Sequence, residues 1–264
     1  MENQEAGLRN TRLDEISTDW AIVRDPARFV MCYAPAVRRY LAALIRNPDH
    51  ADEVAQDFFL GVAAHGFVRT RQAGGRFRDY VKTVIRNAAL NFLHRRHAAK
   101  SADASLLEAA AQRYQASADQ EWMAEWRRCL LDRARRALKQ YQARLPGNLF
   151  HTVLGMVVDN PREDTKTLAA RTSALIGRPL RAEAFRQQVS RARRTLVKFL
   201  VKEVAQTLDE PTAENVEEEL IELGLWKYVR ALLPAGWCPA GRTKEEASAP
   251  GPRSRPDPDQ RRGW

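Results

Sequence analysis

Apolar residues recur every three or four positions along most of this chain, which is the spacing of one face of an α-helix. The alternation of single apolar and polar residues that is typical of strands is hard to find. Three such stripes occupy the first hundred residues: Phe29, Tyr33, Val37, Tyr40, Leu41, Leu44 and Ile45; then Val54, Phe58 and Val62; then Phe77, Tyr80, Val81, Val84, Ile85, Ala88 and Phe92. The sequence therefore predicts an all-α fold, with these three helices closing one small core.

The second half of the chain has the same helical period. A long amphipathic helix runs from Trp122 to Tyr141, and Leu145-Pro146-Gly147 must end it because proline and glycine disfavour continuation. Shorter helices are expected at 149–158, 165–176 and 181–207. The last two are joined by Gly177-Arg178-Pro179, which predicts a helix-turn-helix arrangement.

These patterns predict two small helical bundles joined by a flexible linker. We expect the first domain at 1–100, an acidic linker at 101–120 and the helix-turn-helix domain at 121–207, followed by an acidic amphipathic helix at 208–233. Beyond it, 234–264 holds six prolines and few apolar residues. This tail is expected to be disordered, because it cannot bury enough apolar surface to offset its chain entropy.

Charge is distributed in blocks that follow the predicted helices. The chain carries 43 Lys and Arg against 33 Asp and Glu, a net charge of +10. Seven basic residues against one Asp lie between Arg76 and Lys100, and eight against one Glu between Arg178 and Lys202. Acidic stretches follow both blocks. Two separate cationic helices are typical of a protein that binds a polyanion such as nucleic acid.

Several function classes lack their sequence signals. The three cysteines are far apart and form no CxxC pair, so neither a disulfide framework nor a zinc site is expected. Walker A and GxGxxG patterns are missing, as are an apolar leader and an apolar run of membrane-spanning length. We therefore expect a cytoplasmic, non-enzymatic protein with no metal and no cofactor.

The segment ADEVAQDFF, residues 51–59, resembles the D-A-E-D-x-x-Q-E-x-F signature of bacterial RNA polymerase sigma factors. The helical period turns Val54 and Phe58 inward and the acidic residues outward. By that resemblance, this surface binds the clamp of the polymerase beta-prime subunit, although a solvated acidic face is the alternative interpretation. The predicted polymerase-binding residues are Asp52, Glu53, Gln56, Asp57 and Phe58.

The segment GRFRDYVKTVIRNAALNFLHRR, residues 75–96, resembles the promoter-melting segment of the same family. Basic residues here supply charge opposite phosphates, and amides such as Asn87 offer a donor and an acceptor to a base edge. Phe77, Tyr80 and Phe92 also lie on the apolar stripe, so a core position is their alternative role. The predicted minus-ten DNA-binding residues are Arg76, Tyr80, Lys82, Arg86, Asn87, Asn91, Arg95 and Arg96.

The segment 167–200 ends in VSRARRTL and resembles the family's second helix-turn-helix module. Phe185, Val189, Ala192, Leu196 and Phe199 are expected to face a core. Arg186, Gln187 and Ser190 are candidates for reading bases in the major groove, and the other basic residues are candidates for phosphate contacts. The predicted minus-thirty-five DNA-binding residues are Arg181, Arg186, Gln187, Ser190, Arg191, Arg193, Arg194 and Lys198.

The order of the three elements is that of the two-domain, extracytoplasmic-function class of sigma factor. The resemblance implies a subunit that binds core polymerase at the beta-prime clamp and the beta flap and that recognises promoter DNA. A regulatory protein such as an anti-sigma factor is a further partner to expect. A stand-alone helix-turn-helix regulator is the main alternative; an RNA-binding protein and a recombinase-type enzyme explain less, the first because it has no use for ADEVAQDFF. The acidic segment near 217–233 is hypothesised to fold back on a basic DNA-binding face or to recruit a regulator.

Overall fold

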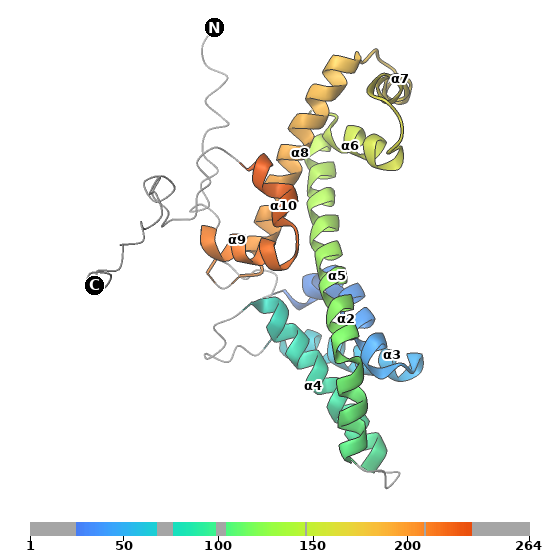
Figure 1. Cartoon of the computed structure of the whole chain (residues 1–264), viewed down its shortest axis with the longest axis vertical. Helices are drawn as coiled ribbons and strands as arrows, with labels where there is room; N and C mark the ends of the chain where they lie inside the picture. Colours follow the sequence, from blue (N-terminus) through green and yellow to red (C-terminus); the bar gives the residue numbers. More distant parts are fainter. Residues whose placement is uncertain (1–24, 68–75, 99–103, 146, 209, 234–264) are drawn as a thin grey trace, which may run out of the picture.

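The first three helices follow the stripes predicted from the sequence. The computed structural model describes residues 25–67, 76–98, 104–145, 147–208 and 210–233. In it α2 spans Pro26–Ile45, α3 spans Pro48–His65 and α4 spans Phe77–Ala98 (Figure 1). Between α2 and α3 the chain turns at Arg46, which has a left-handed φ of 58°, and Asn47 then caps α3 by accepting a hydrogen bond from the His50 amide.

The fourth helix, α5, is much longer than the sequence predicted. It spans Ala104–Arg144, so residues 104–120 are helical where a flexible linker was expected. Figure 1 shows α5 as a single long rod running past α2 and α4. Its buried residues keep helical spacing from the predicted linker onward: Ala118, Trp122, Trp126, Leu130, Ala134 and Leu138. The linker prediction for 101–103 falls outside the described residues.

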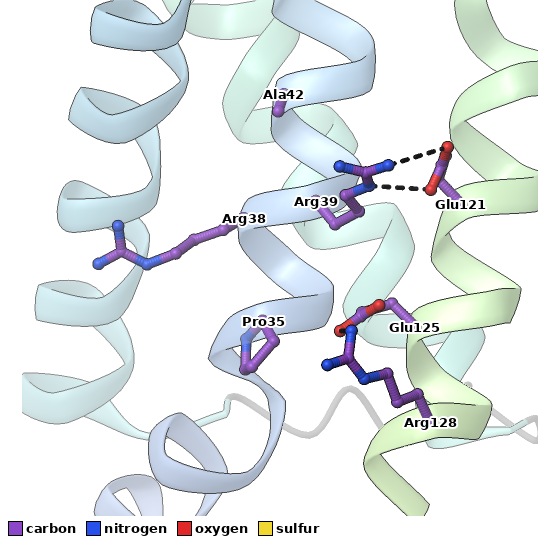
Figure 2. A pocket seen from close by; sticks show the side chains of 7 residues that line it. All are labelled: Pro35, Arg38, Arg39, Ala42, Glu121, Glu125 and Arg128. Atoms are coloured by element: carbon purple, nitrogen blue, oxygen red, sulfur yellow. Dashed lines mark hydrogen bonds and ion pairs between the residues drawn. The ribbon is translucent and has the colours of Figure 1, made fainter.

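The N-terminal half of α5 is also tied to α2 by polar contacts. Arg39 Nε donates to Glu121 at 2.9 Å, and its Nη2 donates to the second carboxylate oxygen at 3.4 Å (Figure 2). The guanidinium of Arg46 lies over the Tyr114 ring, 4.0 Å from its centroid. These contacts are exposed and contribute little each, so burial of Ala118, Trp122 and Trp126 must supply most of the attachment.

Three helices lie close to the positions expected for the shorter helices of the second half. Helix α6 spans Phe150–Asp159, α7 spans Thr165–Ile176 and α8 spans Ala182–Ala205. Gly177 ends α7 with a φ of 67°, a conformation that glycine adopts without steric cost. These helices enclose a small second core of Leu149, Val153, Leu168, Ala169, Phe185, Val189 and Ala192.

The C-terminal half of α8 leaves the second core and enters the first. Val197, Leu200, Val201, Val204 and Ala205 belong to the same buried cluster as the apolar faces of α2 to α5. The packing of α8 against α5 therefore joins the two bundles, in addition to the chain connection that α5 itself provides (Figure 1).

The segment predicted as a single acidic helix at 208–233 is broken into shorter pieces. Helix α9 spans Ala213–Glu222, α10 spans Trp226–Val229 and the 3-10 turn η3 spans Arg230–Leu232. Gly224 lies at the break with a φ of 66°. Val216, Leu220 and Val229 are buried in the first core, whereas Tyr228 is 65% exposed.

The all-α prediction is confirmed, since every regular element in the described ranges is a helix. None of the helices in those ranges combines the length and apolar character that crossing a bilayer requires. The predicted disordered tail at 234–264 falls outside the described residues.

Candidate nucleic-acid interface

The outer surface of α3 carries the residues predicted to bind polymerase. Asp52, Glu53, Gln56 and Asp57, here called the acidic face, are all exposed, while Val54 beneath them is buried. Arg38 of α2 donates to the Asp52 carboxylate at 3.1 Å, but both side chains are more than half exposed. Water screens such a pair, so the acidic face stays available to a cationic partner.

Phe58, the fifth predicted polymerase contact, lies in the first core instead. Its side chain is only 7% exposed, and its ring makes edge contacts with Phe29 and Phe59 at centroid distances of 6.3 and 5.6 Å. The helical period explains this, because Phe58 follows Val54 by four residues and shares its inward direction. Phe58 therefore supports the acidic face from below and is not part of its surface.

Four of the predicted minus-ten residues lie on an open stripe of α4. Asn87, Asn91, Arg95 and Arg96 are all exposed. Asn91 and Arg95 line a hollow of about 500 Å³ between α4 and α3, together with His94, Phe92 and Asp57. The stripe thus offers two amides and two guanidinium groups to a polyanion, next to a recess with an apolar wall formed by Val54, Ala88 and Phe92.

Lys82 and Arg86, predicted to contact phosphates, instead face α5. Lys82 Nζ lies 3.5 Å from Asp119, and Arg86 Nε donates to the Gln115 amide oxygen at 3.0 Å. The Gln115 amide nitrogen in turn donates to the Tyr40 hydroxyl and to Asp119. The polar residues of the expected linker are therefore the partners of these two cations.

Tyr80 lies in an aromatic cluster at the start of α4. Its ring packs edge-on against Phe67 and stacks on Phe77, with centroid distances of 6.1 and 6.4 Å. Partial burial raises the pKa of the Tyr80 hydroxyl above its ordinary value. The alternative interpretation as a core residue therefore holds for Phe77, which is 1% exposed. Tyr80 is only partly buried and lies at the edge of the core.

The Arg76 guanidinium forms ion pairs with carboxylates of α9. Its Nε lies 2.9 Å from Glu219, Nη2 lies 3.6 Å from Glu218, and Nη1 is paired with Glu222. In this conformation the Arg76 guanidinium cannot also contact a phosphate. The role of Arg76 as a DNA contact stays a prediction, and the acidic helix competes for the same charge.

The same contact includes a buried arginine that sequence reasoning missed. The Arg78 side chain is 2% exposed; its Nη1 lies 3.1 Å from Glu219, which is fully buried, and its Nη2 donates to Glu222 at 2.7 Å. Burial raises the pKa of Glu219, and the charges of Arg78 and Arg76 oppose that rise. The signal in the sequence was the match between a basic block and a distant acidic block, but it did not indicate which residues pair.

The basic surface of α8 is exposed in full. All eight predicted minus-thirty-five residues, from Arg181 at the N-cap to Lys198, are accessible, and Phe185, Val189 and Ala192 are buried behind them. Arg186 pairs with Glu183 on the same helix, where both side chains are 63% exposed. A single exposed pair of this kind leaves the surface strongly cationic.

The turn before α8 is fixed by local hydrogen bonds. Asp164 caps α7 by accepting from the Thr167 amide, and this bond lowers the pKa of the Asp164 carboxyl. The Ser173 hydroxyl accepts from the Leu180 amide at 2.8 Å, which anchors the chain between Gly177 and α8. The chain before α8 is thereby tied to α7.

Metal-ligating side chains do not gather in the described ranges, where no three His, Cys, Asp or Glu residues are placed to hold an ion. Cys129 is buried, and burial raises the pKa of its thiol to about 11. Cys32 accepts a hydrogen bond from Arg133 Nη1 at 2.9 Å.

Comparison with known protein families gives one match. Residues 29–99, which include α2, α3 and α4, match the model of sigma-70 region 2. Comparisons with curated proteins and with solved structures give no match. The matched segment contains both the acidic face and the open stripe of α4. Residues 29–99 are therefore similar to sigma-70 region 2, and this similarity supports a sigma-70 family factor.

Proposed function

We propose that this protein is a two-domain sigma factor that binds core RNA polymerase and directs initiation at promoters with minus-ten and minus-thirty-five elements. The region 2 match on α2 to α4 is the observation that carries the proposal. The match supports polymerase binding and promoter melting as the role of this bundle. In this proposal catalysis belongs to polymerase alone.

The acidic face supplies the polymerase contact. Three carboxylates and one amide on a single exposed surface of α3 are suited to a cationic helical partner, and the buried Val54 and Phe58 hold that surface rigid. The partner proposed for it is the clamp of the beta-prime subunit. Electrostatic complementarity of this kind sets orientation and speeds association.

The open stripe of α4 supplies the minus-ten contact. Asn87 and Asn91 carry the donors and acceptors that read a base edge, and Arg95 and Arg96 supply charge for phosphates. The recess beside Asn91 and Arg95 lies where an unstacked base could be held against an apolar wall.

The basic surface of α8 supplies the minus-thirty-five contact. Its N-terminal turns present Arg186, Gln187 and Ser190, and its later turns present further arginines, as a recognition helix in the major groove requires. The same bundle is proposed to contact the beta flap. The extracytoplasmic-function class, a cytoplasmic location and an anti-sigma partner belong to the same proposal.

Reconstitution tests the proposal. The purified chain is added to core polymerase, and promoter-specific transcripts are measured in a run-off assay. Glu53→Arg and Asp57→Arg should weaken core binding at least tenfold, because two repulsive charges replace attractive ones at an interface. Glu217→Arg in α9 is the control for a charge reversal elsewhere. If no promoter is selected, or if the control behaves like the test variants, the proposal fails.

A stand-alone DNA-binding regulator is the second candidate. The observation that favours it is the separate core of the second bundle, which encloses its own apolar residues beneath the basic surface of α8. Such a protein would bind duplex DNA tightly without polymerase. A gel-shift assay with the protein alone separates the two functions, because a sigma factor of the proposed kind should require the polymerase.

A further inference from the structure

Helix α9 covers the beginning of the promoter-melting helix with an ionic cluster. Two arginines, Arg76 just before α4 and Arg78 in its first turn, face Glu218, Glu219 and Glu222 of α9, with Asp79 beside them. Figure 1 shows α9 next to the start of α4, although the two are far apart in sequence. Two guanidinium groups thus meet four carboxyl groups at the start of α4.

The contact occupies Arg76 in the manner of a bound phosphate. A guanidinium group binds carboxylate and phosphate oxygens with the same forked geometry. Arg76 directs all three of its nitrogens to carboxylates of α9, and only 23% of its side chain is exposed. Phosphate of a promoter strand can reach Arg76 only if it displaces Glu218 and Glu222.

Apolar anchors hold α9 in this place. Val216 and Leu220 are fully buried in the first core, and Leu223 and Leu225 are nearly so. Where α8 ends, the Phe77 amide donates to the Thr207 carbonyl at 3.4 Å, which joins the beginning of α4 to the chain that leads into α9. The Thr212 hydroxyl caps α9 at the Asn215 amide.

The buried charges of the cluster are better suited to a contact that can open than to one that only stabilises the fold. Removing Glu219 and Arg78 from water is costly, and an apolar pair of the same size often gives equal or greater stability. The ionic cluster therefore adds specificity for one docked position. It is also open to competition by another anion, which an apolar pair would not be.

Resting on the proposed sigma function, we propose that α9 is an autoinhibitory latch: its glutamates occupy Arg76 of the promoter-melting segment, and promoter phosphate must displace them for full DNA binding. The latch lowers affinity for promoter DNA in the holoenzyme. It leaves core binding by the acidic face of α3 unaffected, because that face lies on another helix.

Charge-removing variants of the exposed glutamates test the latch. Glu218→Gln with Glu222→Gln removes two partners of Arg76 and leaves the buried Glu219 in place. The matched control, Glu214→Gln with Glu217→Gln, makes the same change of charge on the same helix at residues that form no ion pair with Arg76 or Arg78. Holoenzyme with the test pair should bind a promoter fragment about three- to tenfold more tightly than with the control pair, the range of one charge-assisted contact.

Two further measurements identify Arg76 as the group that is released from the glutamates. The salt dependence of promoter binding should steepen by about one unit in the test pair, because one more phosphate contact releases one more counterion. Adding Arg76→Gln to the test pair should abolish both the gain in affinity and the change in slope. Circular dichroism melting of each variant checks that the fold is retained.

The outcomes separate the latch from the function on which it rests. If wild-type holoenzyme initiates at promoters but the test and control pairs bind equally, the latch is rejected and the sigma function stands. If the gain survives Arg76→Gln, a general charge effect replaces the latch. Failure of the wild-type chain to give any promoter-specific initiation rejects the proposed function, and the latch with it.

Discussion

Arg133 of α5 and Glu203 of α8 form a largely buried ion pair where the two helices pack side by side. Arg133 also donates to Gln206 at 3.3 Å and to the Cys32 sulfur of α2 at 2.9 Å. A single guanidinium group thus joins three helices that belong to different parts of the sequence. Replacing Arg133 would leave the Glu203 carboxylate without its ion-pair partner in a largely buried position.

Arg133→Ala should lower the free energy of unfolding by about 3–5 kcal/mol, the cost of breaking a buried ion pair by removing one partner. Urea denaturation followed by circular dichroism measures this change. Arg135→Ala is the matched control, because Arg135 is more than half exposed and makes only a local pair with Asp132. A loss no greater than that of the control would show that Glu203 is well hydrated without Arg133.

The expected linker gives a second prediction, because its helix buries Ala118 against the first core and leaves Ala116 exposed. Ala118→Asp should destabilise the protein by about 3 kcal/mol or more, since it places a charge in an apolar site. Ala116→Asp changes the same residue type two positions away and should have little effect. Equal effects in urea denaturation would favour the flexible linker over the packed helix.

The linker was mispredicted because composition and spacing disagreed. Its acidic residues indicated a solvated segment, yet Ala118, Trp122 and Trp126 continue one buried stripe at steps of four. Two polar residues of the segment, Gln115 and Asp119, pair with Tyr40 and Lys82 of other helices. Those partners are remote in sequence, and a local pattern does not contain them.

Elements with strong local signals were predicted well. Helix α7 has the predicted bounds, because Asp164 caps its beginning and Gly177 ends it in a left-handed conformation. The exposure of the basic residues of α8 also followed from helical period alone. The pairing of Arg76 and Arg78 with Glu219 was not predictable, since like blocks of charge admit many pairings and only the packing of α9 selects one.

The basic surface of α8 gives a third prediction, which follows from the proposed function. Arg186→Ala or Gln187→Ala should relax base preference in the minus-thirty-five element, by about 1–3 kcal/mol for each good base contact. Arg193→Ala or Lys198→Ala should weaken binding evenly across sequences and reduce the salt slope by about one unit. Holoenzyme footprints at several salt concentrations measure both. Identical behaviour of the two pairs would contradict this division of roles.

The buried Cys129 thiol gives a fourth prediction, for alkaline pH. Burial, aided by the charge of Glu125, raises its pKa to about 11 from an ordinary value of 9.0. Between these values the unfolded chain loses the proton while the folded chain keeps it, so stability is intact below pH 9 and falls as pH rises towards 11.

Urea midpoints at intervals from pH 8 to pH 11, measured for the wild type and for Cys129→Ala, isolate this contribution. The variant should lose stability less steeply over that range, because it has no thiol to ionise on unfolding. Parallel curves for the two proteins would show that the Cys129 thiol titrates alike in the folded and unfolded chains.

Helix α5 has a consequence for how the protein can change length. Its 41 residues make a rod of about 60 Å that packs in the first core and contacts α6 of the second bundle. In a flexible linker an added residue only lengthens the linker. In this helix it moves the second bundle by 1.5 Å along the helix axis and rotates it by about 100°. The angle between the acidic face of α3 and the basic surface of α8 is therefore set by helical phase, so that length changes are accommodated at the turn near Gly147 far more easily than within the rod.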